Sequence, residues 1–229
     1  MLDNCIVVPY RNREKHLNYF IENTVPLLQK HIPNGKVVIV EQDWNNNLFN
    51  RGAILNIVFK EYENSTTHFM THDVDINPTE DTIINRYIDN VEHNTIKSIS
   101  VPGDSLGGII KFSSKTIFDI NGFPNDIWGW GAEDIVLQNR ANYFNINIDI
   151  NNHILHSDKN YDKYFLRFDD INDRVSCNNW PNICRYSLDN LSNDDKLAKI
   201  YSSGLNNLTY KIIERKDINS YVEIIKVSI

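Results

Sequence analysis

The sequence predicts one α/β domain in which a mixed, mainly parallel central sheet is flanked by helices. Strand-like and helix-like stretches alternate through the first half of the 229 residues, which is the order that parallel strands with crossover helices require. At this length, a chain that is 41% hydrophobic can build one sizeable core. No Gly/Ser-rich linker or change in composition divides it, so we expect a single domain over residues 1–229.

Short apolar runs bounded by turn residues predict the first strands, and apolar residues at helical spacing predict the helices between them. In chain order these are a strand at 4–8, a helix at 13–29, a strand at 36–40, a helix at 50–62 and a strand at 67–72. The last of these runs directly into Asp73, Val74 and Asp75. Because ligands bind beyond the carboxyl ends of strands in open α/β sheets, we expect these acids at the ligand-binding edge.

The pattern is looser in the second half. It predicts strands at 96–101 and 108–112, helices at 114–120, 133–143 and 193–201, and strands at 209–214 and 221–227. Residues 151–181 are polar, aromatic and irregular, which indicates a long functional loop and not a core element.

Composition excludes several classes of function. A net charge of −7 without a basic cluster argues against a nucleic-acid partner. No segment reaches the roughly 18 apolar residues of a membrane span, and the first residues do not resemble a signal peptide. Three sparse cysteines, Cys5, Cys177 and Cys184, favour free thiols in a reducing compartment. We therefore expect a soluble, cytoplasmic protein, unless an N-terminal anchor has been removed.

The sequence HDVDI at residues 72–76 is the first candidate site. If the backbone continues extended from the strand, Asp73 and Asp75 are two carboxylates separated by one residue that can take different roles, one at a metal ion and the other at a ligand hydroxyl. A solvated turn is the alternative, and the preceding apolar strand and the following Pro78 favour a site.

The sequence HILH is the second candidate. His153 and His156 at i and i+3 can meet one ion in a turn or helix, and with Asp75 they offer the mixed nitrogen and oxygen ligands that suit Mn²⁺. A pair of surface histidines is the alternative.

The third candidate is GFPNDIWGWGAED at residues 122–134. Three glycines and two tryptophans in one loop are costly for a mere connection, because glycine loses much entropy on ordering and tryptophan favours burial. An aromatic core element followed by a helix-capping acid pair is the alternative.

These motifs together resemble the β-1,4-galactosyltransferase family over nearly the whole chain. They are VPYRNREKHL, FNRGAILNI, DVDI, LGGIIKFSSKTIFDINGFPNDIWGWGAED, HILHSD, LRFDD and SSGLNNLTY. The resemblance implies a GT-A (Rossmann-like) fold, a UDP-sugar donor as co-substrate, Mn²⁺ or a similar divalent cation, and inversion at the anomeric carbon. It also implies a nucleotide-binding part at about 1–105 and an acceptor-binding part at about 106–229.

By position in these motifs, the resemblance assigns a role to each candidate residue. The residues that hold the nucleotide and the donor are Pro9, Arg11, Arg13, Phe49, Arg51, Asp73, Val74 and Trp130. The metal ligands are Asp75, His153 and His156, with His153 where vertebrate members usually carry Met. Asp134 resembles the catalytic base, and Glu133 stands beside it. The residues expected to contact the transferred sugar or the acceptor are Ser105, Gly107, Gly108, Gly131, Arg167, Phe168 and Ile171.

Several positions depart from the family. The segment between Val101 and Leu106 is several residues shorter, and Ser105 stands where galactose-specific members carry a bulky Tyr. The smaller side chain leaves room at C2 of the sugar, so UDP-GalNAc joins UDP-Gal as a favoured donor. Ala132 replaces a Gly, and Ile135 stands where an acid is common.

The resemblance therefore predicts a hexosyltransferase that moves a hexose or N-acetylhexosamine to a hydroxyl of a glycan acceptor, with Asp134 as general base. Two other classes fit parts of the pattern. One is a metal-dependent hydrolase that uses Asp73, Asp75, His153 and His156, and the other is a sugar-binding module without catalysis. The acceptor, the linkage and the oligomeric state do not follow from the sequence.

Overall fold

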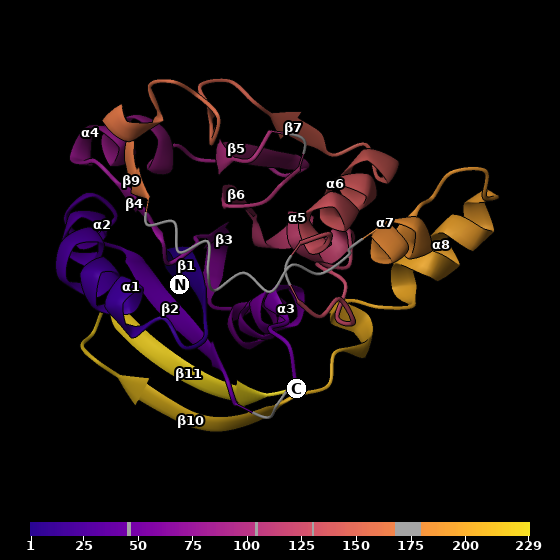
Figure 1. Cartoon of the computed structure of the whole chain (residues 1–229), viewed down its shortest axis with the longest axis horizontal. Helices are drawn as coiled ribbons and strands as arrows, with labels where there is room; N and C mark the ends of the chain where they lie inside the picture. The colour runs from indigo at the N-terminus through magenta and orange to yellow at the C-terminus, as the bar shows by residue number, and fades with distance from the viewer. Residues whose placement is uncertain (45–46, 104, 130, 168–179) are drawn as a thin grey trace.

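A mixed sheet runs through the centre of the molecule, with helices on both faces (Figure 1). The computed structural model describes residues 1–44, 47–103, 105–129, 131–167 and 180–229, without the side chain of Trp180. In this part of the chain the strand order is β10-β11-β2-β1-β3-β6-β5-β7, and β8 also pairs with β5. The pairs β11–β2, β2–β1, β1–β3, β5–β7 and β5–β8 are parallel, and β10–β11, β3–β6 and β6–β5 are antiparallel. The predicted sheet is confirmed.

The strands of this sheet are β1 Leu2–Tyr10, β2 Gly35–Gln42, β3 Thr66–Thr71, β5 Thr95–Val101, β6 Ile109–Ser113, β7 Asn147–Asp149, β8 Ile154–Leu155, β10 Lys211–Asp217 and β11 Val222–Ser228. Strands β4 Ile76–Pro78 and β9 Phe165–Arg167 form a separate antiparallel pair. The α-helices are α1 Glu14–Tyr19, α2 Val25–His31, α3 Arg51–Tyr62, α4 Glu80–Thr82, α5 Ser114–Asp119, α6 Glu133–Tyr143, α7 Trp180–Tyr186 and α8 Asn193–Tyr201. Short helical turns of other types are η1 Phe20–Thr24, η2 Ile83–Tyr87, η3 Tyr161–Lys163 and η5 Leu205–Asn207.

Alternate residues of the central strands supply two cores, one on each face of the sheet. From β1, Cys5 and Val7 pack with α3, α5 and α6, whereas Ile6 and Val8 pack with α1, η1 and α2. All four side chains are fully buried. A parallel strand covered on both faces reads as a continuous apolar run, as NCIVV does.

The helix predicted at 13–29 forms as α1, the π-helical turn η1 and α2 in succession. Pro26 lies in the first turn of α2. Because proline has no N–H and its ring clashes with the carbonyl of the residue four positions earlier, a regular α-helix cannot pass through it. We attribute the wider turn before Pro26 to this clash.

The prediction for residues 151–181 is wrong in part. Ile154, Tyr161 and Phe165 lie in one of the two cores, and β8, η3, β9 and the start of α7 fall in this range. The strands are only two or three residues long, too short for an alternating pattern to reveal them. The segment from β4 to η2 also had no sequence-based prediction.

The ends of the last two strands differ from those predicted. Strands β10 and β11 end later than 214 and 227, and β11 inserts between β10 and β2 as a parallel neighbour of β2. Within the described residues, none of the helices is both long and apolar enough to cross a lipid bilayer.

Candidate active site

Two arginine–aspartate pairs lie at the carboxyl ends of β1 and β3, where the sheet predicts a ligand site. Arg13 Nη1 lies 3.2 Å from Asp75 Oδ2, and Arg51 donates hydrogen bonds to Asp73 Oδ1 from Nε at 3.1 Å and from Nη2 at 2.9 Å. Pro9 lies near the end of β1, and Val74 lies buried between the two acids. The candidate residues of the two motifs VPYRNR and HDVDI are therefore brought together.

Asp73 and Asp75 lie in a turn, so the extended backbone assumed for them is wrong. The turn is closed by a bond from Ile76 N to Asp73 O at 3.2 Å. The two carboxylates nevertheless have different partners, as their separation suggested. Burial and then the charge of Asp73 raise the pKa of Asp75, against the lowering effect of Arg13 and Arg167.

A buried histidine supports this turn, and sequence reasoning missed it. His72 Nδ1 lies 3.0 Å from Asp73 O, which can only accept, so Nδ1 carries the proton. Nε2 then accepts from the Tyr87 hydroxyl at 3.1 Å. Burial lowers the pKa of His72 to about 4, so the imidazole is neutral near pH 7. The only feature of the sequence that could have indicated this role is the position of His72 directly before Asp73.

Arg51 connects the acidic turn to the amino end of α6. Its Nη2 donates to Gly108 O at 3.4 Å, and its Nη1 lies 3.7 Å from Glu133 Oε1. Burial lowers the pKa of Arg51, but the charges of Asp73 and Glu133 outweigh burial and the net pKa is raised. Arg51 is therefore a fixed positive charge between these acids.

The predicted base lies in the first turn of α6 and is held at both oxygens. Ser105 Oγ donates to Asp134 Oδ2 at 2.7 Å, and the amide of Ile135 donates to Oδ1 at 2.9 Å. A Cβ on Gly107 would lie 2.5 Å from Asp134 Oδ2, so the carboxylate lies directly over this glycine. Burial and the neighbouring Asp134 raise the pKa of Glu133 to about 7.

The loop that precedes α6 is fixed by α3. Asn56 donates to Phe123 O at 2.7 Å and accepts from Phe123 N at 3.0 Å. A Cβ on Gly52 would lie 2.6 Å from Pro124 O, which explains the glycine after Arg51. Gly129 N donates to Phe49 O at 2.7 Å. The motifs FNRGAILNI and NGFPN are thus parts of one structural unit.

The end of this loop has left-handed backbone at Gly131 and Ala132, with φ of +87° and +79°. Ala132 is buried with Ile127, Val136 and Tyr186, so this end of the loop packs against α6 and α7. Trp130 lies outside the described residues, as do Phe168 and Ile171.

The structure does not gather the three predicted metal ligands, all of which are among the described residues, into one set. Asp75 is buried, and His156 lies beside Gly108, where a Cβ would be 3.2 Å from its Nε2. The Nδ1 atom of His153 is buried and has no hydrogen-bond partner, which fits a ligand atom. However, no three His, Cys, Asp or Glu side chains among the described residues are gathered closely enough to hold an ion. The three-ligand set remains a prediction.

Arg167 lies near Asp75, a predicted metal ligand, although its predicted role is in the acceptor pocket. It ends β9, where it pairs with Ile76 of β4, and its charge acts on Asp75. Arg11, by contrast, fits the assignment to the nucleotide, since its guanidinium carbon lies 5.7 Å from the centre of the Phe49 ring.

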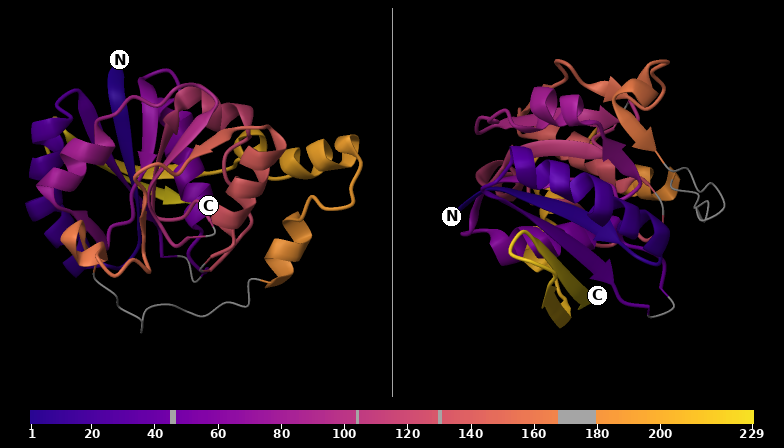
Figure 2. Two further views of the ribbon diagram at one scale, coloured as in Figure 1. Left: turned by 90° about the horizontal axis from the view of Figure 1, so that it is seen from above. Right: turned by 90° about the vertical axis from the view of Figure 1, so that its left-hand side faces the viewer.

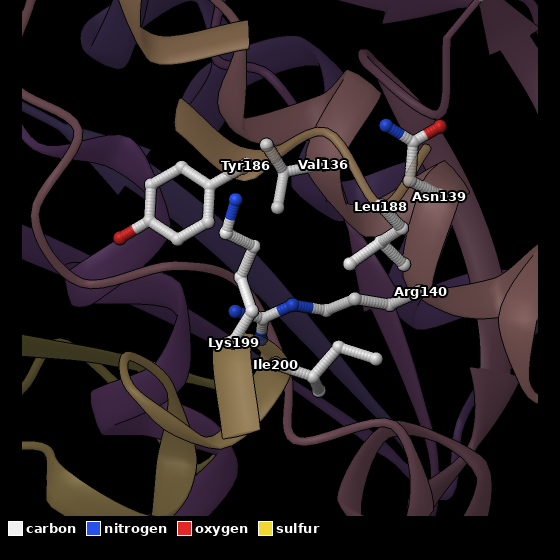
Figure 3. A pocket seen from close by; sticks show the side chains of 7 residues that line it. All are labelled: Val136, Asn139, Arg140, Tyr186, Leu188, Lys199 and Ile200. Atoms are coloured by element: carbon white, nitrogen blue, oxygen red, sulfur yellow. The ribbon is translucent and has the colours of Figure 1, made fainter. Parts of the chain in front are cut away.

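A small cavity of about 10 Å³ lies away from these residues, between α6, α7 and α8 (Figure 3). Arg140 extends across it and donates to Asn121 O, Gly122 O and Ser203 O. The space holds about one water molecule. It contains none of the candidate residues, and Arg140 serves there to hold three loop carbonyls. Figure 2 shows α7 and α8 extending from the main body on this side.

Comparisons with known proteins agree with the geometry. Residues 2–88 match the N-terminal region of glycosyl transferase group 7, and residues 95–163 match a second family, described as the N-terminal domain of galactosyltransferase. β-1,4-Galactosyltransferase 1 of Bos taurus is 28% identical over 96% of this chain, and 53% of that protein is covered. β-1,4-Galactosyltransferase 4 of Cricetulus griseus is 33% identical over 60% of this chain and 42% of that protein. The chain thus spans about half the length of the curated relatives it matches, or less.

One solved structure shows the same fold over the whole chain. It is a Drosophila β-1,4-galactosyltransferase 7 mutant in complex with manganese, UDP-Gal and xylobiose, at a TM-score of 0.77 and 20% identity. The match covers 100% of this chain and 94% of that one. It confirms the predicted GT-A fold.

Proposed function

The chain belongs to the glycosyltransferase group 7 family, whose curated relatives are β-1,4-galactosyltransferases, and we propose that it transfers a sugar from a UDP-sugar to a hydroxyl group of a glycan. The arrangement of Asp134, Arg51 and Asp73 carries this proposal. Arg51 contacts Asp73 at the donor edge and Glu133 beside Asp134. Arg51 thus links the donor edge to the helix that carries the proposed base, so a cation for the donor phosphates lies close to the base for the acceptor.

In the proposed reaction, Asp134 accepts the proton of the attacking hydroxyl as its oxygen bonds to the anomeric carbon. The bond from that carbon to the diphosphate oxygen breaks, and the electron pair leaves with UDP. A positioned base contributes about 100- to 10,000-fold in rate. Because there is one displacement from the face opposite the leaving group, an α-linked donor gives a β-linked product.

The leaving diphosphate gains negative charge, and the arginines at the carboxyl ends of the strands are placed to offset it. Arg13 and Arg51 are oriented by Asp75 and Asp73, so their guanidinium groups need no large reorganisation. Asp75, His153 and His156 would hold the divalent cation, which supplies positive charge to the leaving group when bound. The buried, unpartnered Nδ1 of His153 supports this choice.

We propose UDP-Gal and UDP-GalNAc as the favoured donors. Ser105 is buried beside the base, and its side chain is much shorter than the tyrosine of galactose-specific members, so it would obstruct an N-acetyl group at C2 of the sugar less. A panel of UDP-Gal, UDP-GalNAc, UDP-Glc and UDP-GlcNAc tests the choice. Ser105→Tyr should lose activity with the N-acetylated donors more than with UDP-Gal, and an unchanged order of donors would refute the steric argument.

The two rival functions make different predictions. A UDP-release assay with and without Mn²⁺ and with a GlcNAc-type acceptor separates them. A transferase requires the cation and is accelerated by the acceptor. A metal-dependent hydrolase would release product at the same rate without acceptor, and a sugar-binding module would release none.

We also propose that the protein acts in a reducing compartment, the cytosol. Cys5 is fully buried as a free thiol, and burial raises its pKa, so it packs as a small apolar side chain. A fluorescent fusion imaged in the native host tests the location, and retention in a secretory organelle would contradict it.

A further inference from the structure

Trp44 is an exposed aromatic residue at the ligand-binding edge of the sheet, and it lies outside the motifs of the candidate site. It follows β2 by two residues, as Arg11 follows β1 directly. Parallel β1 and β2 end side by side, with Tyr10 opposite Glu41. Trp44 exposes 66% of its surface, although a tryptophan usually buries most of its large apolar ring.

Trp44 and Phe49 both approach the guanidinium group of Arg11. The guanidinium carbon lies 5.3 Å from the centre of the Trp44 ring and 5.7 Å from that of Phe49, within the range of cation–π attraction. Arg11 also donates to Asn47 O at 2.8 Å, which fixes its direction. The Arg11 guanidinium and the rings of Trp44 and Phe49 therefore lie close together.

The two rings differ in how they are held. Phe49 is partly buried against the core, and its carbonyl accepts from Gly129 N. Most of the Trp44 side chain is exposed, so a ligand can still pack on its ring. Two acids that precede Trp44, Glu41 and Asp43, each have a carboxylate oxygen 3.7 Å from Lys226 Nζ, so their charge is partly offset where an anionic ligand would approach.

We propose that Trp44 is a nucleobase-stacking residue of the donor site, on which the base of the UDP-sugar packs in addition to Phe49. The inference rests on the proposed function, because it takes the ligand to be a nucleoside diphosphate sugar. Every base has a flat π face, so Trp44 raises affinity for the nucleotide without selecting uracil. Arg11 serves the phosphate end of the same ligand.

Comparing UDP with inorganic pyrophosphate tests the inference, because only UDP carries a base. Affinities are measured by titration calorimetry in one Mn²⁺ buffer for the wild type, Trp44→Ala, Trp44→Phe and the control Tyr201→Ala, an exposed aromatic residue on α8. We expect Trp44→Ala to bind UDP about tenfold more weakly, as loss of one base stack predicts. Its pyrophosphate affinity stays unchanged, and the Phe and control variants bind UDP as the wild type does.

Wild-type affinity for UDP in Trp44→Ala would overturn the inference and leave the proposed function standing. An equal loss of UDP and pyrophosphate would also overturn it, since it would indicate a structural role. Absence of UDP binding by the wild type would overturn the proposed function and the inference with it.

Discussion

The hydroxyl of Ser105 donates a hydrogen bond to the carboxylate of Asp134, with Oγ 2.7 Å from Oδ2. The sequence suggested only that Ser105 makes room beside the donor sugar. In the structure the serine also orients the proposed base, because the amide of Ile135 holds the other oxygen. This hydrogen bond connects the short segment after β5 to the first turn of α6 at the proposed base.

We expect Ser105→Ala to reduce kcat about tenfold, because a hydrogen bond to a charged group contributes roughly 1.5–3 kcal/mol. KM for the donor should change little, since the serine hydroxyl contacts the base. Steady-state kinetics with a saturating acceptor measure both. Ser105→Thr keeps the hydroxyl and should retain most activity; equal losses in the two variants would show that the hydroxyl has no positioning role.

Gly107→Ala should lower kcat without unfolding the protein. The added methyl group would lie 2.5 Å from Asp134 Oδ2, so the carboxylate must move. A misplacement of about 1 Å can cost about 100-fold in rate. Gly103→Ala is the control for backbone strain in the same loop, because its methyl group would meet nothing within 4 Å but its φ of +131° is one that residues with a side chain rarely adopt. If both variants lose activity equally, loop strain and not displacement of the base is responsible.

Mn²⁺ should raise the melting temperature, and His153→Ala should reduce this shift. A cation at 100 times its Kd stabilises the folded state by about 2.7 kcal/mol. Differential scanning calorimetry with and without Mn²⁺ measures the shift independently of turnover. His93→Ala serves as the control, because this exposed histidine pairs with Asp119 on the surface. A wild-type shift in His153→Ala would remove His153 from the ligand set.

The free energy of unfolding should depend on pH through Glu133. Its pKa rises from 4.5 to about 7 on folding, so between these values the folded protein keeps a proton that the unfolded chain has released. The contribution of Glu133 to the free energy of unfolding is therefore most favourable below about pH 4.5, and it decreases as the pH rises to about 7. Glu133→Gln should flatten this part of the profile and stabilise the protein at pH 8 by up to about 3 kcal/mol.

Urea denaturation from pH 4.5 to pH 8 gives the profile, and the difference between variant and wild type isolates Glu133 from other titrating groups. Glu214→Gln changes an exposed glutamate on β10 and should leave the profile as it is. Parallel profiles for Glu133→Gln and the wild type would contradict the assigned pKa shift.

The elements that could be predicted from sequence are those with a long, regular pattern. Helices α6 and α8 have the predicted bounds, and the NCIVV and KVVIV runs are central strands because both of their faces are covered. Strands β8 and β9 could not be found, since two or three residues carry no period.

Within the site, sequence identified the residue types but not their contacts. Ser105 and Asp134 are 29 positions apart, and nothing in either motif indicates that one bonds to the other. The turn at Asp73–Asp75 depends on His72 and Tyr87, whose hydrogen bond joins β3 to η2, an element that the pattern did not reveal. Such contacts arise from the tertiary fold and have no local signal.

The central claim is that Asp134 removes the proton of the attacking hydroxyl, and Asp134→Asn tests it most directly. Turnover of a UDP-sugar with acceptor and UDP affinity, both in Mn²⁺ buffer, are measured on the same preparation. We predict that UDP affinity stays at the wild-type value and that kcat falls by at least about 100-fold. A variant that binds UDP normally and keeps kcat within about tenfold of the wild type would contradict the claim.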